Sequence, residues 1–183
     1  QLLKELQSDE SLILVFGGGV FADSVRKVYS EVNMSEKTGN FLALKSTEIF
    51  SHLVNQICND TCLISDPNNL RIQTEKIKIW LPSKTLRNET TFIKSWDSTS
   101  DSVAAWLHNK VNSKGLIFIK SLTLKKKTYK LSYLKGKNVL DKNIDKYLLR
   151  NQNIKIVGPD VINLLEKYKD FYLFSKQLNE IKL

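Results

Sequence analysis

The sequence predicts an α/β fold, a three-layer αβα sandwich around a mainly parallel central sheet. Short, almost fully apolar segments, typical of strands buried on both faces, alternate with longer segments whose apolar residues recur at helical spacing. Each crossover between parallel strands lays its helix on the sheet, so this alternation covers both faces. With 183 residues, 42% of them apolar, and no linker-like stretch, we expect a single domain over residues 1–183.

The first strand is expected at Ser11 to Phe16, a short apolar run that ends in Gly17, Gly18 and Gly19. Beyond the glycines, apolar residues between positions 20 and 32 recur at helical spacing, with charged residues on the other side. Glycines between a buried strand and a helix N-terminus allow backbone N–H groups to approach an anion. The alternative is a tight turn that needs glycine for structural reasons alone.

The remaining elements continue the alternation of helices and strands. Further helices are predicted over residues 41–57 and 103–111. Further strands are predicted at residues 61–65, 77–81, 116–119 and 154–157. Beyond Leu122 the pattern is less regular, and there we predict a hairpin strand over 128–134, a helix over 141–149 and a strand over 172–174.

A second unusual segment runs from Ser95 to Asp101 and reads Ser-Trp-Asp-Ser-Thr-Ser-Asp. It leads directly into a predicted helix, so one of its hydroxyls is expected to cap that helix. Capping does not account for Asp97 and Asp101, two carboxylates four residues apart at one helix entrance. Such a pair can orient a lysine, a Mg²⁺ ion or a substrate hydroxyl.

Together, the two segments resemble the amino acid kinase superfamily. Val15 to Arg26 is similar to its Gly-Gly-Gly-x-Phe-Ala-Asp motif, and Ser95 to Leu107 to its Ser-Trp-Asp-x-Thr-Ser-Asp-Ser-x-Ala motif. The greatest similarity is to a small branch related to the aminomethylfuranyl-methyl phosphate kinase of methanofuran biosynthesis. The resemblance covers residues 11 to 124, and the rest of the chain matches only loosely.

The resemblance implies ATP-dependent phosphoryl transfer, assisted by Mg²⁺, to a phosphorylated small molecule, which in that branch is a furan-type phosphate monoester. By position, the anionic end of this acceptor would be held by Gly17, Gly18 and Gly19. Asp101 and Lys120 would be the catalytic residues, with Asp101 organising lysines around the transferring group. Further substrate contacts are expected from Thr99, Ser100, Asp23 and Arg26, the last two having a solvated helix face as the alternative. Nucleotide contacts are expected from Lys120, Ser121 and Thr123.

The sequence departs from the family pattern at two places. The family opens with a strand and a Lys-x-Gly-Gly-Ser motif whose lysine contacts the donor phosphates; this sequence starts after that point, so we expect the N-terminal strand to be missing from it. Ser121 and Thr123 also replace both aspartates of the family's Lys-Asp-Val-Asp-Gly nucleotide segment. The alternative hypothesis is a catalytically degenerate kinase-fold subunit that binds nucleotide or anion and partners an active protein.

Composition restricts the partners further. The formal net charge of +9 comes almost entirely from lysine, which argues against nucleic acid as a partner because its recognition favours the arginine fork. The longest apolar run is too short to cross a bilayer and no secretory signal is evident, so we expect a cytoplasmic protein without a membrane segment. No metal site built by the protein is expected, and the family resemblance implies a homo-oligomer based on dimers.

Overall fold

Two sheets form the framework of the computed structural model, which describes residues 3, 6, 11–149 and 152–183. The first sheet has the strand order β1-β3-β2 and the second β4-β6-β7-β5. Their strands are β1 (Ile13–Leu14), β2 (Thr61–Ile64), β3 (Ile77–Trp80), β4 (Leu116–Ile119), β5 (Thr128–Lys130), β6 (Ile154–Val157) and β7 (Asn179–Lys182). Among these described strands every pair is parallel except β6 with β7.

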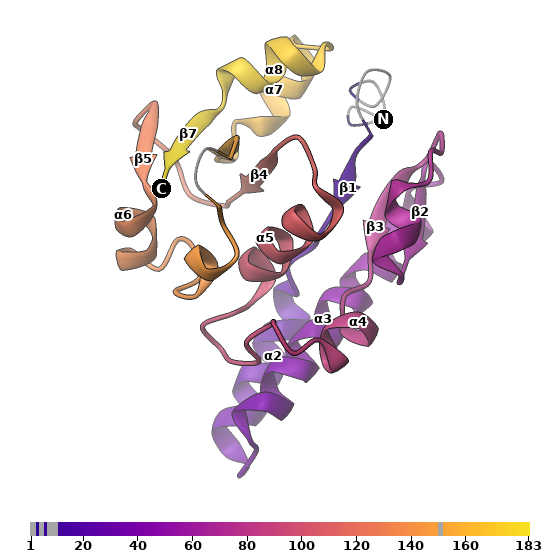
Figure 1. Cartoon of the computed structure of the whole chain (residues 1–183), viewed down its shortest axis with the longest axis vertical. Coiled ribbons are helices and arrows are strands. Elements are labelled where there is room, and N and C mark those ends of the chain that lie inside the picture. The colour runs from indigo at the N-terminus through magenta and orange to yellow at the C-terminus, as the bar shows by residue number, and fades with distance from the viewer. Residues whose placement is uncertain (1–2, 4–5, 7–10, 150–151) are drawn as a thin grey trace.

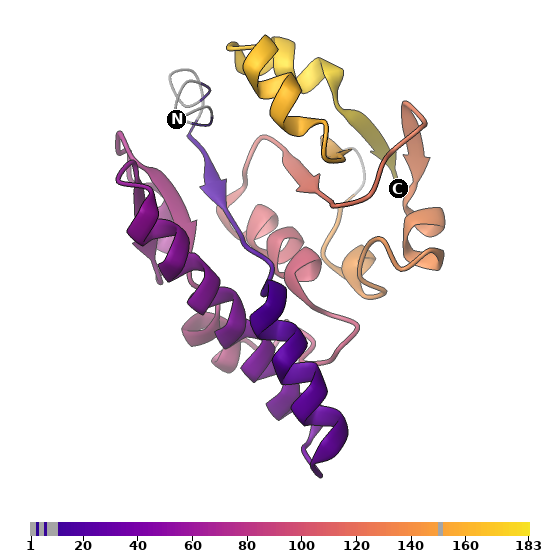
Figure 2. The ribbon, with the colours of Figure 1, turned by 180° about the vertical axis from the view of Figure 1, so that it is seen from behind.

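Helices pack on the strands and connect them (Figures 1 and 2). The longer helices are α2 (Gly19–Glu31), α3 (Glu36–Ile57) and α5 (Ser100–Val111). The shorter ones are α4 (Ser83–Asn88), α6 (Leu131–Gly136), α7 (Val161–Lys167), α8 (Phe171–Gln177) and the 3-10 turns η1 (Pro67–Arg71) and η2 (Ile144–Lys146). The predicted α/β class with mainly parallel strands is confirmed, although the strands form two sheets where one was expected.

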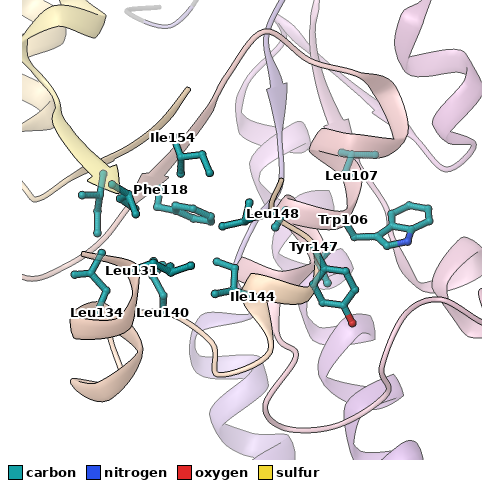
Figure 3. Close-up of a cluster of buried hydrophobic side chains, with 14 of the residues drawn as sticks. Trp106, Leu107, Phe118, Leu131, Leu134, Leu140, Ile144, Tyr147, Leu148 and Ile154 are labelled. Carbon is teal, nitrogen blue, oxygen red and sulfur yellow. The ribbon is translucent and has the colours of Figure 1, made fainter. Parts of the chain in front are cut away.

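The main hydrophobic core joins the two sheets through α5. Trp80, at the end of β3, stacks on Trp106 of α5 with ring centroids 5.8 Å apart. Figure 3 shows how this core continues from Trp106 and Leu107 past Phe118 of β4 to Leu131 and Leu134. Burying each such side chain contributes about 1.5–3 kcal/mol relative to exposure. The core therefore fixes α5, whose N-terminus carries the second sequence motif, against both sheets.

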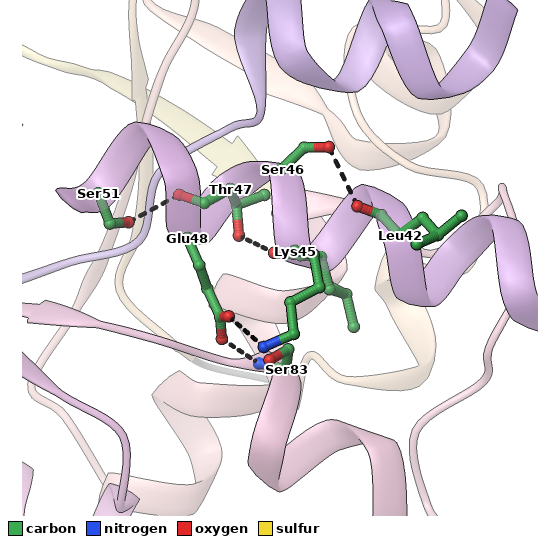
Figure 4. A network of polar contacts seen from close by, with 8 residues as sticks. Leu42, Lys45, Ser46, Thr47, Glu48, Ser51 and Ser83 are labelled. Carbon is green, nitrogen blue, oxygen red and sulfur yellow. Dashed lines mark hydrogen bonds and ion pairs between the residues drawn. The ribbon is translucent and has the colours of Figure 1, made fainter. Parts of the chain in front are cut away.

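A polar network fixes α3 to the start of α4 (Figure 4). Glu48 is buried, and its carboxylate accepts hydrogen bonds from the Ser83 backbone N–H at 2.8 Å and from Lys45 Nζ at 2.9 Å. Ser83 directly follows Pro82, which ends the connection from β3. Because a buried carboxylate is stable only when it is paired and hydrogen-bonded, this contact joins α3 to the start of α4.

Three sequence predictions for the C-terminal part are wrong. Residues 128–134 do not form a hairpin strand: β5 ends at Lys130, pairs in parallel with β7, and is followed by α6. Of the helix predicted over residues 141–149, only η2 forms. Residues 172–174 belong to α8, because the Asp170 carboxylate accepts from the Leu173 N–H and caps a helix there. For β5 and α8, contacts formed only in the folded chain outweigh the local apolar pattern.

Candidate functional site

The two sequence motifs meet in space. Gly17 lies between β1 and α2, and a Cβ built on it would be 3.7 Å from Ser100 Oγ at the start of α5. The N-termini of two long helices, α2 and α5, therefore lie at one place. Backbone N–H groups and the positive end of the helix dipole at such ends favour an anion.

The three glycines of this loop are needed for different reasons. At buried Gly18, a Cβ would lie 2.5 Å from Ala22 Cβ and 3.2 Å from Ser46 Cβ, so packing excludes a side chain. Gly19 has φ of +49°, a left-handed conformation that favours glycine. Structural reasons thus account for these two positions. At Gly17, which is exposed and faces Ser100, neither reason applies.

An ion pair lies beside this loop, at the entrance of α5. Lys120, directly after β4, donates from Nζ to Asp101 Oδ1 at 2.7 Å and Oδ2 at 2.6 Å. The two side chains are only 21% and 12% exposed. Burial raises the pKa of Asp101 to about 6; Lys120 opposes this rise and the nearby charge of Asp141 adds to it. At neutral pH Asp101 is therefore mostly ionised and holds the Lys120 ammonium in place.

Asp141 contributes to the same helix entrance and was not identified from the sequence. Its Oδ2 accepts from the backbone N–H groups of Thr99 at 2.6 Å and Ser102 at 2.9 Å, and its Oδ1 accepts from Thr99 Oγ1 at 2.6 Å. The Thr99 hydroxyl, which was predicted to contact substrate, thus has a partner within the protein. No local pattern distinguishes Asp141 from the other aspartates of the chain.

The other predicted site residues lie around this centre at different distances from it. Asp23 and Arg26 form an exposed ion pair on α2, 2.7 Å long, and the Arg26 guanidinium carbon lies 5.8 Å from the ring centroid of Trp96 in the second motif. Ser121 and Thr123 are exposed on the loop that follows Lys120. The structure therefore brings the glycine loop together with Ser100, Asp101 and Lys120. Asp23, Arg26, Ser121 and Thr123 lie on exposed surfaces outside this centre.

Comparison with known proteins finds a similar fold and a partial match in sequence. The crystal structure of uridylate kinase from Archaeoglobus fulgidus matches 98% of this chain and 89% of its own, with a TM-score of 0.64 and 14% sequence identity. The chain has an amino acid kinase fold. In sequence, it is 30% identical over 105 residues, 55% of its length, to the [5-(aminomethyl)furan-3-yl]methyl phosphate kinase of Methanocaldococcus jannaschii. This match spans about half, 47%, of the curated relative. No family model matches the sequence.

Within this amino acid kinase fold, the donor set at the site does not form a metal cage. No group of three or more His, Cys, Asp or Glu side chains is placed to bind a metal ion among residues 3, 6, 11–149 and 152–183. Asp101 and Asp141 are each engaged by donors of the protein. In the same described part of the chain, none of the helices has the length and apolar character that crossing a bilayer requires.

A separate pocket lies at the other end of α5 from the motif. It has a volume of 340 Å³ and is lined by Thr91, Trp106, Asn109, Lys110, Lys146 and Tyr147. The Lys110 ammonium lies over the Trp106 ring, 5.8 Å from its centroid. None of the residues predicted for the kinase site lines this pocket.

The packing at Gly18 gives a stability prediction. Gly18→Ala is expected to destabilise the protein by about 1–3 kcal/mol, because the new methyl group overlaps Ala22 and Ser46. The free energy of unfolding in urea measures this. Gly136→Ala is the matched control, since a Cβ there meets nothing within 4 Å. Equal stability of the two variants would contradict the packing described for the glycine loop.

Proposed function

We propose that residues 1–183 form a single ATP-dependent kinase domain that phosphorylates a phosphate monoester, of the furan type used in methanofuran-like cofactor biosynthesis. The observation that carries this proposal is the largely buried Asp101–Lys120 ion pair at the helix entrance that also faces Gly17. An anion cradle next to a held ammonium group is the combination that phosphoryl transfer needs. The name of the curated relative supports the choice of acceptor.

In the proposed reaction, a phosphate oxygen of the acceptor attacks the γ-phosphorus of ATP, and the bond between that phosphorus and the leaving ADP oxygen breaks. The products are ADP and a diphosphate ester. A phosphate monoester has a second pKa of about 6 and is mostly a dianion at neutral pH, so its oxygen needs no general base. This agrees with a site in which the Asp101 carboxylate is already paired with an ammonium.

Each part of the site has one task in this proposal. The backbone N–H groups at Gly17 to Gly19 bind the phosphate of the acceptor. Lys120 neutralises charge on the transferring group, and Asp101 keeps its ammonium oriented. Lys120, Ser121 and Thr123 lie on the nucleotide side, and Ser100, Arg26 and Asp23 on the acceptor side. Mg²⁺, which binds phosphates and water more readily than protein cages, would arrive on ATP and neutralise its β- and γ-phosphates.

We also propose a cytoplasmic homo-oligomer based on dimers, with nucleotide and a phosphorylated small molecule as its ligands. The side chains of Ile49, Leu53 and Ile57 follow one another at intervals of four along α3, and all three are exposed. Residues four apart lie on one face of a helix, so these form an apolar stripe that a second copy would cover. This supports the oligomer.

A second candidate function is a non-catalytic subunit that retains the kinase fold. It is favoured by Ser121 and Thr123, which stand in place of the family's two carboxylates and are exposed after β4. The two candidates differ in one measurable respect. The kinase forms ADP and a diphosphate ester, whereas the non-catalytic subunit binds nucleotide and forms neither.

The test is an ADP-release assay of the full-length natural protein with ATP and Mg²⁺. We expect ADP release with furan-type phosphate monoesters and none with the corresponding furan alcohols, which lack the phosphate that the glycine loop binds. If the protein binds nucleotide but forms no ADP with any phosphate monoester as acceptor, the kinase is rejected in favour of the non-catalytic subunit. ADP release with the alcohol alone would reject the proposed acceptor class.

The pH dependence of this reaction follows from Asp101. Below its pKa of about 6, Asp101 takes up a proton and releases Lys120, so turnover is expected to fall by roughly tenfold per pH unit in the acid range. The acceptor phosphate, with a second pKa of about 6, loses its dianion over the same range. A pH–rate profile that stays flat between pH 7 and pH 5 would contradict both effects.

A further inference from the structure

A short segment of the C-terminal half, residues 141–143, contacts the second motif at positions along most of the motif. Asp141, Lys142 and Asn143 are consecutive, and each contacts the segment between Ser95 and Ser102. Lys142 Nζ lies 3.2 Å from Asp97 Oδ1. These contacts join parts of the chain that are 39 to 48 residues apart, and the segment lies outside the region of sequence resemblance.

Asn143 holds the beginning of the motif. Its Nδ2 donates to Ser98 Oγ at 3.0 Å and to Ser95 Oγ at 3.3 Å, and its backbone N–H donates to the Asp97 carbonyl at 3.0 Å. From the other side, Nδ2 of buried Asn40, in α3, donates to the carbonyls of Ser95 and Ser98 at 2.8 and 2.9 Å. The loop before α5 is therefore fixed between α3 and the 141–143 segment.

Asp141 holds the end of the motif and replaces a local helix cap. Thr99, the N-cap residue of α5, makes no capping hydrogen bond with its own side chain. The Asp141 carboxylate instead takes the Thr99 and Ser102 N–H groups, together with the Thr99 hydroxyl. Ser100 and Asp101, the residues that face the glycine loop and Lys120, lie between these two anchored positions.

The main core anchors the 141–143 segment itself. Leu140 and Ile144, which flank it, are 2% and 0% exposed, and both lie in the hydrophobic cluster of Figure 3. Buried side chains in a close-packed core have little freedom to shift. The position of Asp141, and with it the entrance of α5, is therefore fixed by the same core that contains Phe118 of β4, the strand that Lys120 directly follows.

We propose that Asp141 is a positioning residue for phosphoryl transfer: its carboxylate fixes the α5 entrance so that the Asp101–Lys120 pair is held toward the glycine loop. This inference rests on the proposed function. Asp141 touches neither substrate nor Lys120 in this role. It acts through Thr99, Ser102 and the charge that it places near Asp101.

The charge has a separate, measurable effect. The groups that act on Asp101 are Lys120 at the end of β4 and Asp141 before η2, while the neighbouring Asp97 and Lys142 are paired with each other. The negative charge of Asp141 helps to raise the pKa of Asp101. Removing this charge while keeping the hydrogen bonds should therefore lower the pKa of Asp101.

Asp141→Asn removes the negative charge but keeps the hydrogen bonds. The amide oxygen can still accept from both N–H groups, and the amide nitrogen can donate to Thr99 Oγ1. We expect the pKa of Asp101, followed by NMR of its carboxyl carbon in the full-length protein, to fall relative to the wild type. The acid limb of the pH–rate profile should move to lower pH with it. If the acid limb came from protonation of the acceptor phosphate, it would stay at the same pH in this variant, because the acceptor is unchanged.

Asp141→Ala removes the hydrogen bonds as well, and turnover at pH 8 is expected to fall by roughly tenfold or more, since small displacements of catalytic groups have effects of this order. The loss in Asp141→Asn should be smaller. Asp145→Asn is the matched control, because it removes the same charge from a residue that pairs with Lys135 away from the motif. It should change neither the turnover nor the pKa of Asp101.

The outcomes separate this inference from the proposed function. If the wild type turns over but Asp141→Asn leaves the pKa of Asp101 unchanged, or Asp141→Ala keeps full turnover, the positioning role is overturned and the kinase stands. If the wild type does not turn over at all, both the proposed function and the positioning role of Asp141 are rejected, whatever the titration of Asp101 shows.

Discussion

Asp101→Asn is expected to abolish phosphoryl transfer while leaving the fold intact. The amide is close in size to the carboxylate but carries no charge and has one acceptor oxygen, so it loses the ion pair and one of the two hydrogen bonds from the Lys120 ammonium, now 2.7 and 2.6 Å long. An interaction that holds a charge-stabilising cation on a transferring phosphoryl group is worth roughly a thousandfold or more in turnover. Steady-state ADP release, corrected for the ATPase background, measures the loss.

The same substitution should make the protein more stable at neutral pH. The pKa of Asp101 rises from its usual 3.8 to about 6 in the folded state, so the folded protein binds this proton more tightly than the unfolded chain does. The stability contributed by Asp101 is therefore greatest below pH 4 and is lost as the pH rises through 6. At about 1.4 kcal/mol per pKa unit, its ionisation costs the folded state of the order of 2–3 kcal/mol at pH 7.

Urea unfolding of the wild type and Asp101→Asn at pH 7 and pH 4 tests this. The variant should be the more stable at pH 7, and the difference should shrink at pH 4, where Asp101 is protonated in the folded wild type. Asp145→Asn, in a more exposed ion pair, should show a much smaller difference at either pH. Full kinase activity in Asp101→Asn would remove the role assigned to this residue, and a loss of stability at pH 7 would contradict the cost assigned to its burial.

Lys120→Met is expected to reduce phosphoryl transfer by roughly a thousandfold, the order contributed by a cation that neutralises the transferring group. The substitution keeps most of the apolar length of the side chain and removes only the ammonium. Asp101 then lies buried without its cation, and its pKa rises further, so that it takes up a proton at neutral pH. This uptake limits the loss of stability that an unpaired buried charge would otherwise cause.

The double variant Asp101→Asn/Lys120→Met tests whether the pair acts as a unit. If Asp101 works by holding Lys120, the double variant should be no less active than Lys120→Met alone, because the two losses are not additive. Lys127→Met, which removes an exposed lysine outside the site, is the control for net charge. Turnover within threefold of the wild type in Lys120→Met, or fully additive losses, would contradict this interpretation.

Much of the fold could be predicted from the sequence, because apolar periodicity is strong where strands are buried on both faces. All four residues of β3 are buried, and the segment 77–81 was identified by its apolar run. The amphipathic pattern likewise located α2, α3 and α5. The pattern failed beyond residue 122, where tertiary contacts decide the local structure. For example, the Tyr129 hydroxyl accepts from the N–H groups of Lys125 and Lys126 and closes a loop before α6.

The candidate site, like the fold, could be predicted from the sequence only in part. The glycine loop and the Ser95–Asp101 segment were identified because each breaks a regular pattern and together they resemble a family. The sequence alone did not show that Gly18 is needed for packing and Gly19 for its backbone conformation, whereas neither reason applies to Gly17. These roles follow from the positions of Ser46, Ala22 and Ser100 in the structure and from the positive φ of Gly19. Asp141 could not be found from sequence alone, because its partners are about 40 residues away and no periodicity connects them.

The most direct test of the kinase proposal is ³¹P NMR of the full-length protein with ATP, Mg²⁺ and a furan-type phosphate monoester. We expect the monoester signal to be replaced by the two coupled signals of a diphosphate ester, formed in the same amount as ADP, and no such product with Asp101→Asn. Release of inorganic phosphate without a diphosphate ester, or product formation by Asp101→Asn at the wild-type rate, would contradict the central claim.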